Sequence, residues 1–239
     1  RRTGGALDLS IYPVVRAWGF TTGDYQVPSD DDLATLTALV DYTRIDYDPA
    51  SGAVSLPEGM EIDLGSVAKG YAGREAAQLL RQAGVSSALL NLGGNIQTVG
   101  SRPDGDPWQI GVKDPSTGQP MMVLSIRDQA VVTSGGYERY FQQDGRTYWH
   151  IMDPATGRPA ESGLRSVTIV GDDGLVCDGL STALFVMGLE RAAQFWAGSD
   201  DFEAIFVTDD GSVYLTQGLT DRFALTQDHA DTPVQVIQR

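Results

Sequence analysis

The stretch Asp63–Tyr71, which reads DLGSVAKGY, is the most informative part of the chain. It follows an alternating apolar run from Met60 to Leu64, which is typical of a strand, and precedes a helical pattern over residues 72–83. A strand, a glycine turn and a helix start would present main-chain N–H groups and the positive end of a helix dipole to an anion. Lys69 opposes that dipole. A bound phosphate explains this lysine as well as a turn capped by Ser66 with a solvated lysine does.

Composition excludes several kinds of partner. The chain has 239 residues, enough for one domain or two small ones, and a net charge of -15. This charge argues against nucleic acid and against an anionic membrane surface. A phosphorylated ligand would therefore need a metal or locally placed cations. The single cysteine, Cys177, excludes an internal disulfide and a cysteine zinc cluster, and we predict that it is a buried core thiol.

The chain carries no visible signal peptide, lipobox or membrane-length apolar run, and it opens at Arg1 without a methionine. We interpret it as a processed or trimmed piece. The missing signal is therefore no evidence for a cytoplasmic location.

Short patterned runs separated by acidic turns predict an α+β fold with largely antiparallel sheets. The expected helices lie at 33–40, 72–83, 178–187 and 189–197, the last two separated by Gly188. The expected strands lie at 43–47, 53–56, 88–92, 108–113, 121–126, 130–133, 148–152, 167–170, 204–208 and 213–215. One turn pattern, Asp-Pro-x-[Ser/Thr]-Gly, occurs at Asp48–Gly52, Asp114–Gly118 and Asp153–Gly157. It indicates repeated hairpin turns, and an internal duplication is the alternative.

Three further segments are polar where a core pattern predicts apolar residues. Asn91–Ile96 ends a predicted buried strand, and its two glycines would let a ligand approach the backbone, although a plain turn explains them equally well. His150, with Asp153 three residues on, is a candidate general base or acid, and a structural histidine is the alternative. Asp178 and Thr182 share one helical face and suit a hard cation such as magnesium, unless Asp178 only caps the helix.

Other enzyme templates are absent from the sequence. It contains no GxxxxGK[ST] phosphate loop, no GxGxxG after a strand and no HExxH zinc motif. It also contains no GxSxG serine elbow.

At these segments the sequence resembles the FAD:protein FMN transferase (ApbE-type flavin transferase) family. The matching blocks follow one another in order through nearly the whole chain. They are Gly5–Ser10, Pro13–Phe20, Asp63–Tyr71, Asn91–Ile96, Trp108–Pro115, Thr133–Gly135 with Tyr137–Phe141, His150–Gly157 and Asp178–Leu184.

The resemblance implies an ApbE-like (T-fold-like) mixed α/β fold, with residues 1–239 forming a single catalytic domain that lacks the family's N-terminal segment. It implies magnesium-dependent transfer of FMN from FAD to a threonine hydroxyl of a target redox membrane protein, with release of AMP. The alternatives are an FAD pyrophosphatase and a non-catalytic FAD-binding protein. An extracytoplasmic, lipid-anchored or periplasmic location is also implied, and the oligomeric state is left open.

The resemblance further assigns roles to individual residues. The proposed base is His150. The implied FAD contacts are Asp8, Asp63, Lys69, Asn91, Gly93, Gly94 and the backbone near Ile151 and Met152. The implied magnesium site comprises Ser66, Asp178, Ser181 and Thr182. This assignment agrees with the chemistry, because phosphoryl transfer needs charge neutralisation and an in-line nucleophile, and an ordinary imidazole with a pKa of about 6.5 is basic at neutral pH. Asp178–Ala183 also resembles the family's acceptor motif, but Leu184 stands where the acceptor hydroxyl would be, which excludes self-modification there.

Overall fold

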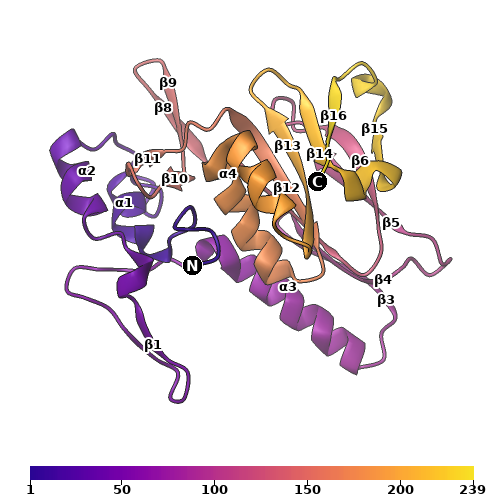
Figure 1. Cartoon of the computed structure of the whole chain (residues 1–239), viewed down its shortest axis with the longest axis horizontal. Helices are drawn as coiled ribbons and strands as arrows, with labels where there is room; N and C mark the ends of the chain where they lie inside the picture. The colour runs from indigo at the N-terminus through magenta and orange to yellow at the C-terminus, as the bar shows by residue number, and fades with distance from the viewer. The chain divides into compact units, whose positions relative to one another are not determined.

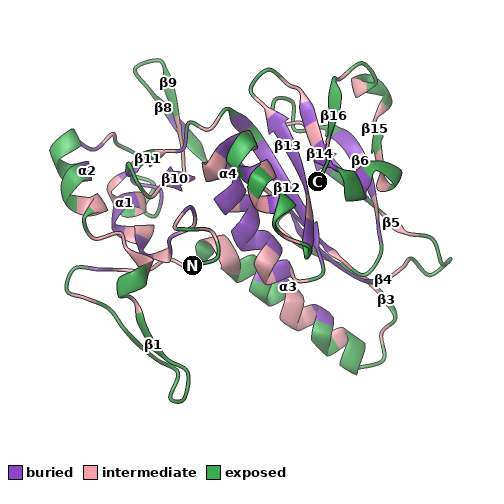
Figure 2. Ribbon diagram, in the orientation of Figure 1, coloured by how far each residue is buried: buried purple, intermediate pink, exposed green.

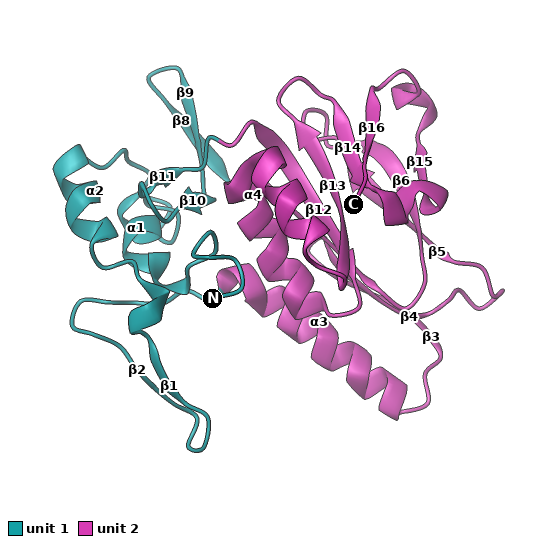
Figure 3. Ribbon diagram, in the orientation of Figure 1, with its two compact units in different colours: residues 1–64, 138–161 teal, residues 65–137, 162–239 magenta.

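The computed structural model describes residues 1–239, and Figure 1 shows the whole chain. The chain divides into two compact units, coloured in Figure 3. The first unit comprises Arg1–Leu64 and Glu138–Glu161, and the second comprises Gly65–Tyr137 and Ser162–Arg239. That residues 1–239 act as a single catalytic domain stays a prediction, as does the internal duplication.

The second unit is built on a seven-stranded sheet with the strand order β16-β14-β13-β12-β7-β4-β3. Every neighbouring pair is antiparallel except β14 and β16, which are parallel. The strands are β3 (Ser87–Leu92), β4 (Asn95–Gly100), β7 (Ala130–Gly135), β12 (Leu164–Gly171), β13 (Phe202–Thr208), β14 (Val213–Thr216) and β16 (Val234–Ile237). The predicted α+β class with largely antiparallel sheets is confirmed.

Both faces of this sheet are covered. Helices α3 (Gly65–Gln82) and α4 (Gly174–Ala197) pack on one face, chiefly on β4, β7 and β12. A three-stranded antiparallel sheet covers the other face; its strands are β5 (Trp108–Lys113), β6 (Pro120–Ile126) and β15 (Phe223–Leu225). The 3-10 helices η3 (Gln217–Arg222) and η4 (Gln227–His229) flank β15.

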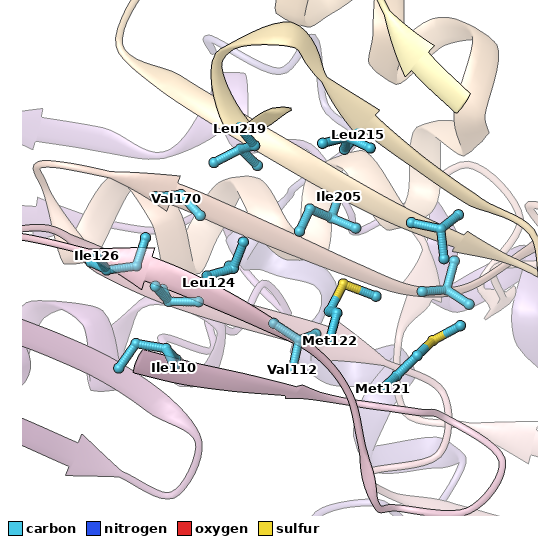
Figure 4. Close-up of a cluster of buried hydrophobic side chains, with 13 residues drawn as sticks. Ile110, Val112, Met121, Met122, Leu124, Ile126, Val170, Ile205, Leu215 and Leu219 are labelled. Carbon is cyan, nitrogen blue, oxygen red and sulfur yellow. The ribbon is translucent and has the colours of Figure 1, made fainter. Parts of the chain in front are cut away.

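A cluster of buried apolar side chains lies between the two sheets (Figure 4). Its buried side chains come from both sheets and include Met122, Leu124, Val170, Ile205 and Leu215. Because β12 and β13 are covered on both faces, they are buried almost along their whole length, as Figure 2 shows. Strands buried on both faces have nearly continuous apolar sequences, which is why their hydrophobic runs were recognisable.

The first unit is smaller and centres on Trp18. Its elements are η1 (Leu9–Ile11), α1 (Tyr12–Ala17), α2 (Asp30–Thr37), η2 (Tyr42–Arg44), β1 (Asp46–Asp48), β2 (Ala53–Ser55), β8 (Tyr140–Gln143), β9 (Arg146–Trp149), β10 (Met152–Asp153) and β11 (Arg158–Pro159). The fully buried Trp18 packs with Phe20, Phe141 and Met152, and its indole N–H donates to the Gly157 carbonyl at 2.8 Å. Ser29 caps α2 by accepting the Asp32 N–H, and the helix begins three residues before the expected 33–40.

The recurring turn pattern forms the same structure three times. In each turn the aspartate side chain accepts the N–H of the second residue after it, at 2.7–2.9 Å. In each, the final glycine N–H donates to the aspartate carbonyl at 2.8 Å. Gly52, Gly118 and Gly157 all have positive φ, which explains why the pattern ends in glycine. The predicted turns are therefore confirmed.

The break between the two C-terminal helices is also confirmed. Gly188 has φ 75° and ψ 168° inside α4, so the helical backbone is interrupted there. Only a residue without a Cβ adopts this conformation readily. Cys177 is buried in α4, as predicted, although in a helix and not in an extended run.

Three sequence-based expectations are wrong. No strand forms over residues 60–64, and α3 begins at Gly65, seven positions before the expected helix. Strand β3 lies at the edge of the sheet, so it is half-exposed and not buried. The expected strand over residues 60–64 and the expected burial of β3 are wrong because apolar alternation does not reveal which strands find a partner.

Every helix in the chain lacks either the length or the apolar composition required to cross a membrane.

Candidate functional site

The opening motif forms the first two turns of α3, which lie directly against α4. The N–H of Gly70 donates to Oδ2 of Asp178 at 2.7 Å, in a buried bond between the two helices. The helices meet at glycines: a Cβ added to Gly70 would lie 2.1 Å from the carbonyl oxygen of Gly174 and 2.6 Å from Cβ of Asp178. Gly70 therefore serves close helix packing, and Gly65 is the first residue of α3 and not part of the expected turn. Asp178 is in the second turn of α4, whose N-cap is Asp173. The capping alternative for Asp178 is thus excluded.

We expect Gly70→Ala to destabilise the protein by about 3 kcal/mol, because the added methyl collides with main chain, which moves less easily than a side chain. Gly73→Ala in the same helix is the matched control. Its Cβ would meet mainly the flexible Leu92 side chain at 3.3 Å, and alanine adds about 1 kcal/mol of helix propensity. Urea unfolding of both variants measures the difference, and equal stabilities would contradict this account of the helix contact.

The Asp178 carboxylate is buried, which costs free energy when it is ionised. It is 5% exposed, and burial raises its pKa above the ordinary value, because a carboxylate loses hydration when it is ionised there. The Gly70 N–H, the positive charge of Lys69 and the Asn95 amide act in the opposite direction. Both polar atoms of the Asn95 amide lack a hydrogen-bond partner, so this amide acts on the Asp178 pKa as a nearby dipole. The positive charge of the exposed Lys69 thus acts on a carboxylate of the protein, and its contact with a phosphorylated ligand stays a prediction.

A group of hydroxyls continues from Asp178 along α4 to β7. The Ser134 hydroxyl lies 2.7 Å from that of Ser181 and 3.2 Å from that of Thr182. Ser181 is fully buried, and its hydroxyl also donates to the Asp178 carbonyl at 2.8 Å. Because Ser181 has two protein partners, the half-buried Thr182 is the better-placed hydroxyl for a ligand. Ser66 is the second residue of α3 and half-buried.

These residues were tested for their fit to a divalent metal by the chemistry of their donor atoms. The chain contains no cluster of three or more His, Cys, Asp or Glu side chains that could hold a metal. Asp178, Thr182 and Ser66 supply only oxygen ligands, with a single carboxylate. Magnesium is commonly bound in this way, by one or two carboxylates together with substrate phosphates and water. The donor set therefore fits magnesium bound together with a phosphorylated substrate, and it does not fit zinc, which prefers nitrogen and sulfur ligands.

The segment at Asn91–Asn95 is a two-residue β-hairpin between β3 and β4. Gly93 and Gly94 have φ values of 62° and 91°, as a type I′ turn requires, and Leu92 pairs with Asn95. Asn91 Oδ1 accepts the Gly94 N–H at 2.9 Å. The plain-turn explanation accounts for all three predicted contact residues, and their contact with FAD stays a prediction.

Two predicted FAD contacts, Asp8 and Asp63, lie in the first unit. Asp8 is buried and already accepts three hydrogen bonds, from the N–H and hydroxyl of Ser10 and from the N–H of Tyr42. Its carboxylate therefore holds η1 against the start of η2. The Asp63 N–H donates to the Leu9 carbonyl at 2.8 Å, which ties the end of this unit's first segment back to η1.

His150 also belongs to the first unit and is oriented by main chain. Its Nδ1 lies 3.2 Å from the Arg139 carbonyl oxygen, and its own N–H donates to the same oxygen at 3.1 Å. A carbonyl only accepts, so Nδ1 carries the proton and the basic lone pair lies on Nε2. The Asp153 carboxylate accepts the Ala155 N–H in the turn that follows. Ile151 and Met152 are buried, and the Ile151 carbonyl accepts from Ala160 at 2.9 Å.

A surface hollow of about 550 Å³ lies elsewhere on the second unit. Its lining comprises Arg81, Arg127, Asp128, Gln129, Asp172 and Arg222, and none of them is a predicted site residue. The charges are satisfied locally: Arg81 pairs with Asp128 at 2.8 Å, and Arg222 donates to Gln129 at 2.7 Å. Hence we place the functional site at the contact between α3 and α4 and not in this hollow.

Sequence reasoning missed two residues that the structure brings to this site. Ser134 bonds to both predicted hydroxyls, and Asn95 faces the same helices from β4. Asn95 stands inside a segment that was singled out as unusually polar, and Ser134 inside a block that matches the family. A polar residue at an inward-facing strand position was the signal that could have identified them.

The second unit thus defines an α+β protein in which one buried carboxylate and neighbouring hydroxyls suit a metal–phosphate ligand. Comparison with known proteins agrees. The ApbE family model matches residues 1–206. The FAD:protein FMN transferase of Klebsiella pneumoniae is 38% identical over 92% of this chain and 68% of its own length. That of Treponema pallidum is 36% identical over 92% of this chain and 66% of its own length.

Solved structures give the same result. The ApbE protein of Thermotoga maritima superposes with a TM-score of 0.85 and is 34% identical, covering 90% of this chain and 71% of its own. The apo form of the flavinyl transferase ApbE of Pseudomonas stutzeri gives 0.76 at 31% identity, covering 96% and 70%. The chain belongs to the ApbE family, which confirms the predicted family and fold. It spans about two thirds of the length of the two curated relatives.

Proposed function

We propose that this chain is an FAD:protein FMN transferase, which moves the FMN moiety of FAD to a threonine hydroxyl of an acceptor protein and releases AMP. The observation that carries the proposal is the buried Asp178 carboxylate, bonded to the Gly70 N–H at 2.7 Å beside the hydroxyl of Thr182. Burying a carboxylate is costly, and a metal bound together with a phosphorylated substrate would compensate that cost, so its presence favours such a substrate at this site. Family members that bear this enzyme name support the assignment.

The reaction forms a bond from the threonine oxygen to the FMN phosphorus and breaks the bond from that phosphorus to the AMP oxygen. We propose that Asp178 and Thr182, with the main chain near Ser66, would hold a magnesium ion. Bound magnesium neutralises charge on the pyrophosphate. Lys69 adds a positive charge near the same carboxylate. These local cations offset the repulsion between an anionic substrate and a chain of net charge -15.

We propose His150 as the base that takes the proton of the acceptor hydroxyl at Nε2. Its support is the hydrogen bond from Nδ1 to the Arg139 carbonyl, which fixes the tautomer with a basic Nε2. His150 belongs to the first unit and Asp178 to the second, and each role rests on its own evidence. The remaining FAD contacts, Asp8, Asp63, Asn91, Gly93, Gly94, Ile151 and Met152, are proposed from the family motifs alone.

Incubation of the protein with FAD, magnesium and a threonine-bearing acceptor domain tests this function. Covalently attached flavin on the acceptor, visible as in-gel fluorescence, with one AMP released for each flavin attached, is the expected result. Free FMN and AMP without labelled acceptor would mean an FAD pyrophosphatase. Unchanged FAD would mean binding without catalysis. An extracytoplasmic location and a redox membrane protein as acceptor are proposed on the family resemblance.

A further inference from the structure

Arg139 and His150 lie opposite each other at the base of the hairpin that β8 and β9 form (Figure 1). The strands pair antiparallel from Tyr140 and Trp149 toward the turn. The hydrogen bond from the His150 N–H to the Arg139 carbonyl, at 3.1 Å, extends this pairing by one residue. Because two strands alone are marginally stable, the place of His150 depends on the contacts that hold the hairpin base within its unit.

Arg139 makes such a contact with its side chain and another with its main chain. Its guanidinium donates to the carbonyl oxygen of Phe20, a residue that follows α1 in the same unit. Its own carbonyl accepts from the His150 N–H and lies 3.2 Å from Nδ1 of the His150 ring. The side chain of Arg139 thus ties the hairpin base to the segment after α1, while its main chain orients the imidazole.

Phe20 completes a closed set of contacts. It is 1% exposed and belongs to the apolar cluster around Trp18, so its own position is well determined. The edge-to-face contact between the Phe20 and His150 rings has a centroid distance of 6.3 Å and an interplanar angle of 60°. A ring that is held by a hydrogen bond at one nitrogen and by an aromatic neighbour at its side keeps one orientation and one tautomer.

The bond of Arg139 differs from those of other arginines in the first unit. Arg16, Arg146 and Arg158 each pair with a carboxylate, in contacts between exposed charges. Arg139 instead donates to a main-chain carbonyl of a buried residue. A long side chain that bonds to the main chain of another segment acts as a tether, and exchanging its charge for an apolar end removes the tether alone.

We propose that Arg139 is a positioning residue for the proposed base: its bond to the Phe20 carbonyl fixes the hairpin base, and with it the carbonyl that keeps the His150 proton on Nδ1 and the lone pair on Nε2. The inference rests on the proposed function, since it takes His150 as the base. Arg139 acts through His150 and touches no reacting atom.

The test compares wild type with Arg139→Met, Arg139→Lys and Arg146→Met. Methionine keeps an unbranched stem without a donor, and lysine keeps a donor at its end. Arg146 lies on the same hairpin and pairs with Glu161 at 3.2 Å, away from the hairpin base, so Arg146→Met is the matched control. All four proteins are assayed for FMN transfer, for FAD binding and for the melting temperature.

The tautomer of His150 is measured separately, on protein without FAD or acceptor. The chain contains only two histidines, so the ¹⁵N NMR spectrum of histidine-labelled protein is simple, and His229→Ala assigns its signals. The spectra are recorded above the pH range in which an ordinary imidazole titrates, where the ¹⁵N shifts distinguish the Nδ1–H from the Nε2–H form. This measurement does not depend on any catalytic role of His150.

We expect the Nδ1–H form in wild type and in Arg146→Met, and a mixture of both forms in Arg139→Met. In Arg139→Met, kcat should fall about 10–100-fold, the size of effect that a small misplacement of a reacting group produces, while FAD binding is unchanged. Arg139→Lys should recover most of the tautomer and of kcat. Because Arg139 is exposed, its replacement should change the melting temperature little.

The outcomes separate this proposal from the proposed function. A wild-type tautomer and wild-type kcat in Arg139→Met would overturn the positioning role and leave His150 as the proposed base. A lower melting temperature or weaker FAD binding with an unchanged tautomer would also overturn it, in favour of a structural or substrate-binding role. A mixed tautomer with wild-type transfer would confirm that Arg139 fixes the ring and would contradict His150 as the base.

A second variant covers the case in which Arg139→Met does not fold. Arg139→Gln carries a shorter amide that ends before the position of the guanidinium, so it weakens the tether to Phe20 without an apolar end. The same mixture of tautomers and the same fall in kcat are expected. An Nδ1–H form with wild-type kcat in this variant would again overturn the positioning role.

Discussion

The substitution Asp178→Asn is expected to abolish FMN transfer and, at the same time, to stabilise the metal-free protein. Transfer should fall by more than about 100-fold, because a direct ligand contributes more than the outer partners that cost 10–100-fold. Asparagine has nearly the same shape and still accepts the Gly70 N–H through its amide oxygen. The expected loss is therefore one of charge and not of packing.

The gain in stability follows from the raised pKa of Asp178. Burial disfavours the ionised carboxylate in the folded state, so this group destabilises the fold at neutral pH. The penalty disappears as the pH falls through the raised pKa toward the ordinary value of 3.8, where the carboxyl is protonated in both states. Asp178→Asn should thus add roughly 0.5–2 kcal/mol at pH 7, a typical range for one stabilising substitution.

Thermal unfolding as a function of pH measures this difference, which should shrink as the pH falls through the raised pKa toward 3.8. Asp173→Asn is the matched control. It changes the N-cap of the same helix, where aspartate and asparagine serve equally well, so transfer should be retained. A variant Asp178→Asn that is less stable than wild type at neutral pH would contradict the account of a costly carboxylate.

The second large effect is expected for His150→Ala, which should lose FMN transfer while FAD still binds. A positioned general base contributes about 10²–10⁴-fold to a proton-transfer step, and kcat should fall by this amount. Equilibrium titration of FAD by flavin fluorescence gives the binding constant, and labelled acceptor gives the rate. The other histidine, His229, bonds to Thr226 and Asp114 and belongs to no matching block or predicted site, so His229→Ala should transfer normally.

Partial recovery of His150→Ala by added imidazole would support a proton-transfer role. Retained transfer by this variant, with FAD binding unchanged, would remove His150 from the mechanism. Loss of FAD binding together with transfer would instead make His150 a binding residue.

Local patterns predicted much of the fold correctly, because they involve residues close in sequence. Gly188 was recognised as a helix break, and the aspartate-proline turns formed with the expected bonds. The burial of strands was predicted less well: β3 resembles a buried strand in sequence but lies at a sheet edge. Whether a strand lies at the edge or in the centre of a sheet is decided by residues far away in the chain, and no local sequence pattern contains them.

The residues of the candidate site were also predicted where the pattern is local and missed where the contact is long-range. The sequence identified Asp178 and Thr182 as a pair on one helical face, and both belong to α4. It could not identify the partner of Asp178, because Gly70 stands 108 residues away and contributes a main-chain N–H that any residue except proline possesses. Ser134 was missed for a related reason, since its contact with α4 depends on the pairing of β7 in the sheet.

The main-chain origin of that hydrogen bond has a consequence for how the family can vary. The main-chain N–H of Gly70 remains a donor when neighbouring side chains are exchanged. Substitutions at other positions of α3 therefore leave its hydrogen bond to Asp178 in place. Exposed positions beside it, such as Tyr71 and Ala72, are open to substitution. Position 70 is not, because a Cβ collides there and proline would remove the donor. A deep mutational scan should therefore find an intolerant residue at 70 next to tolerant neighbours.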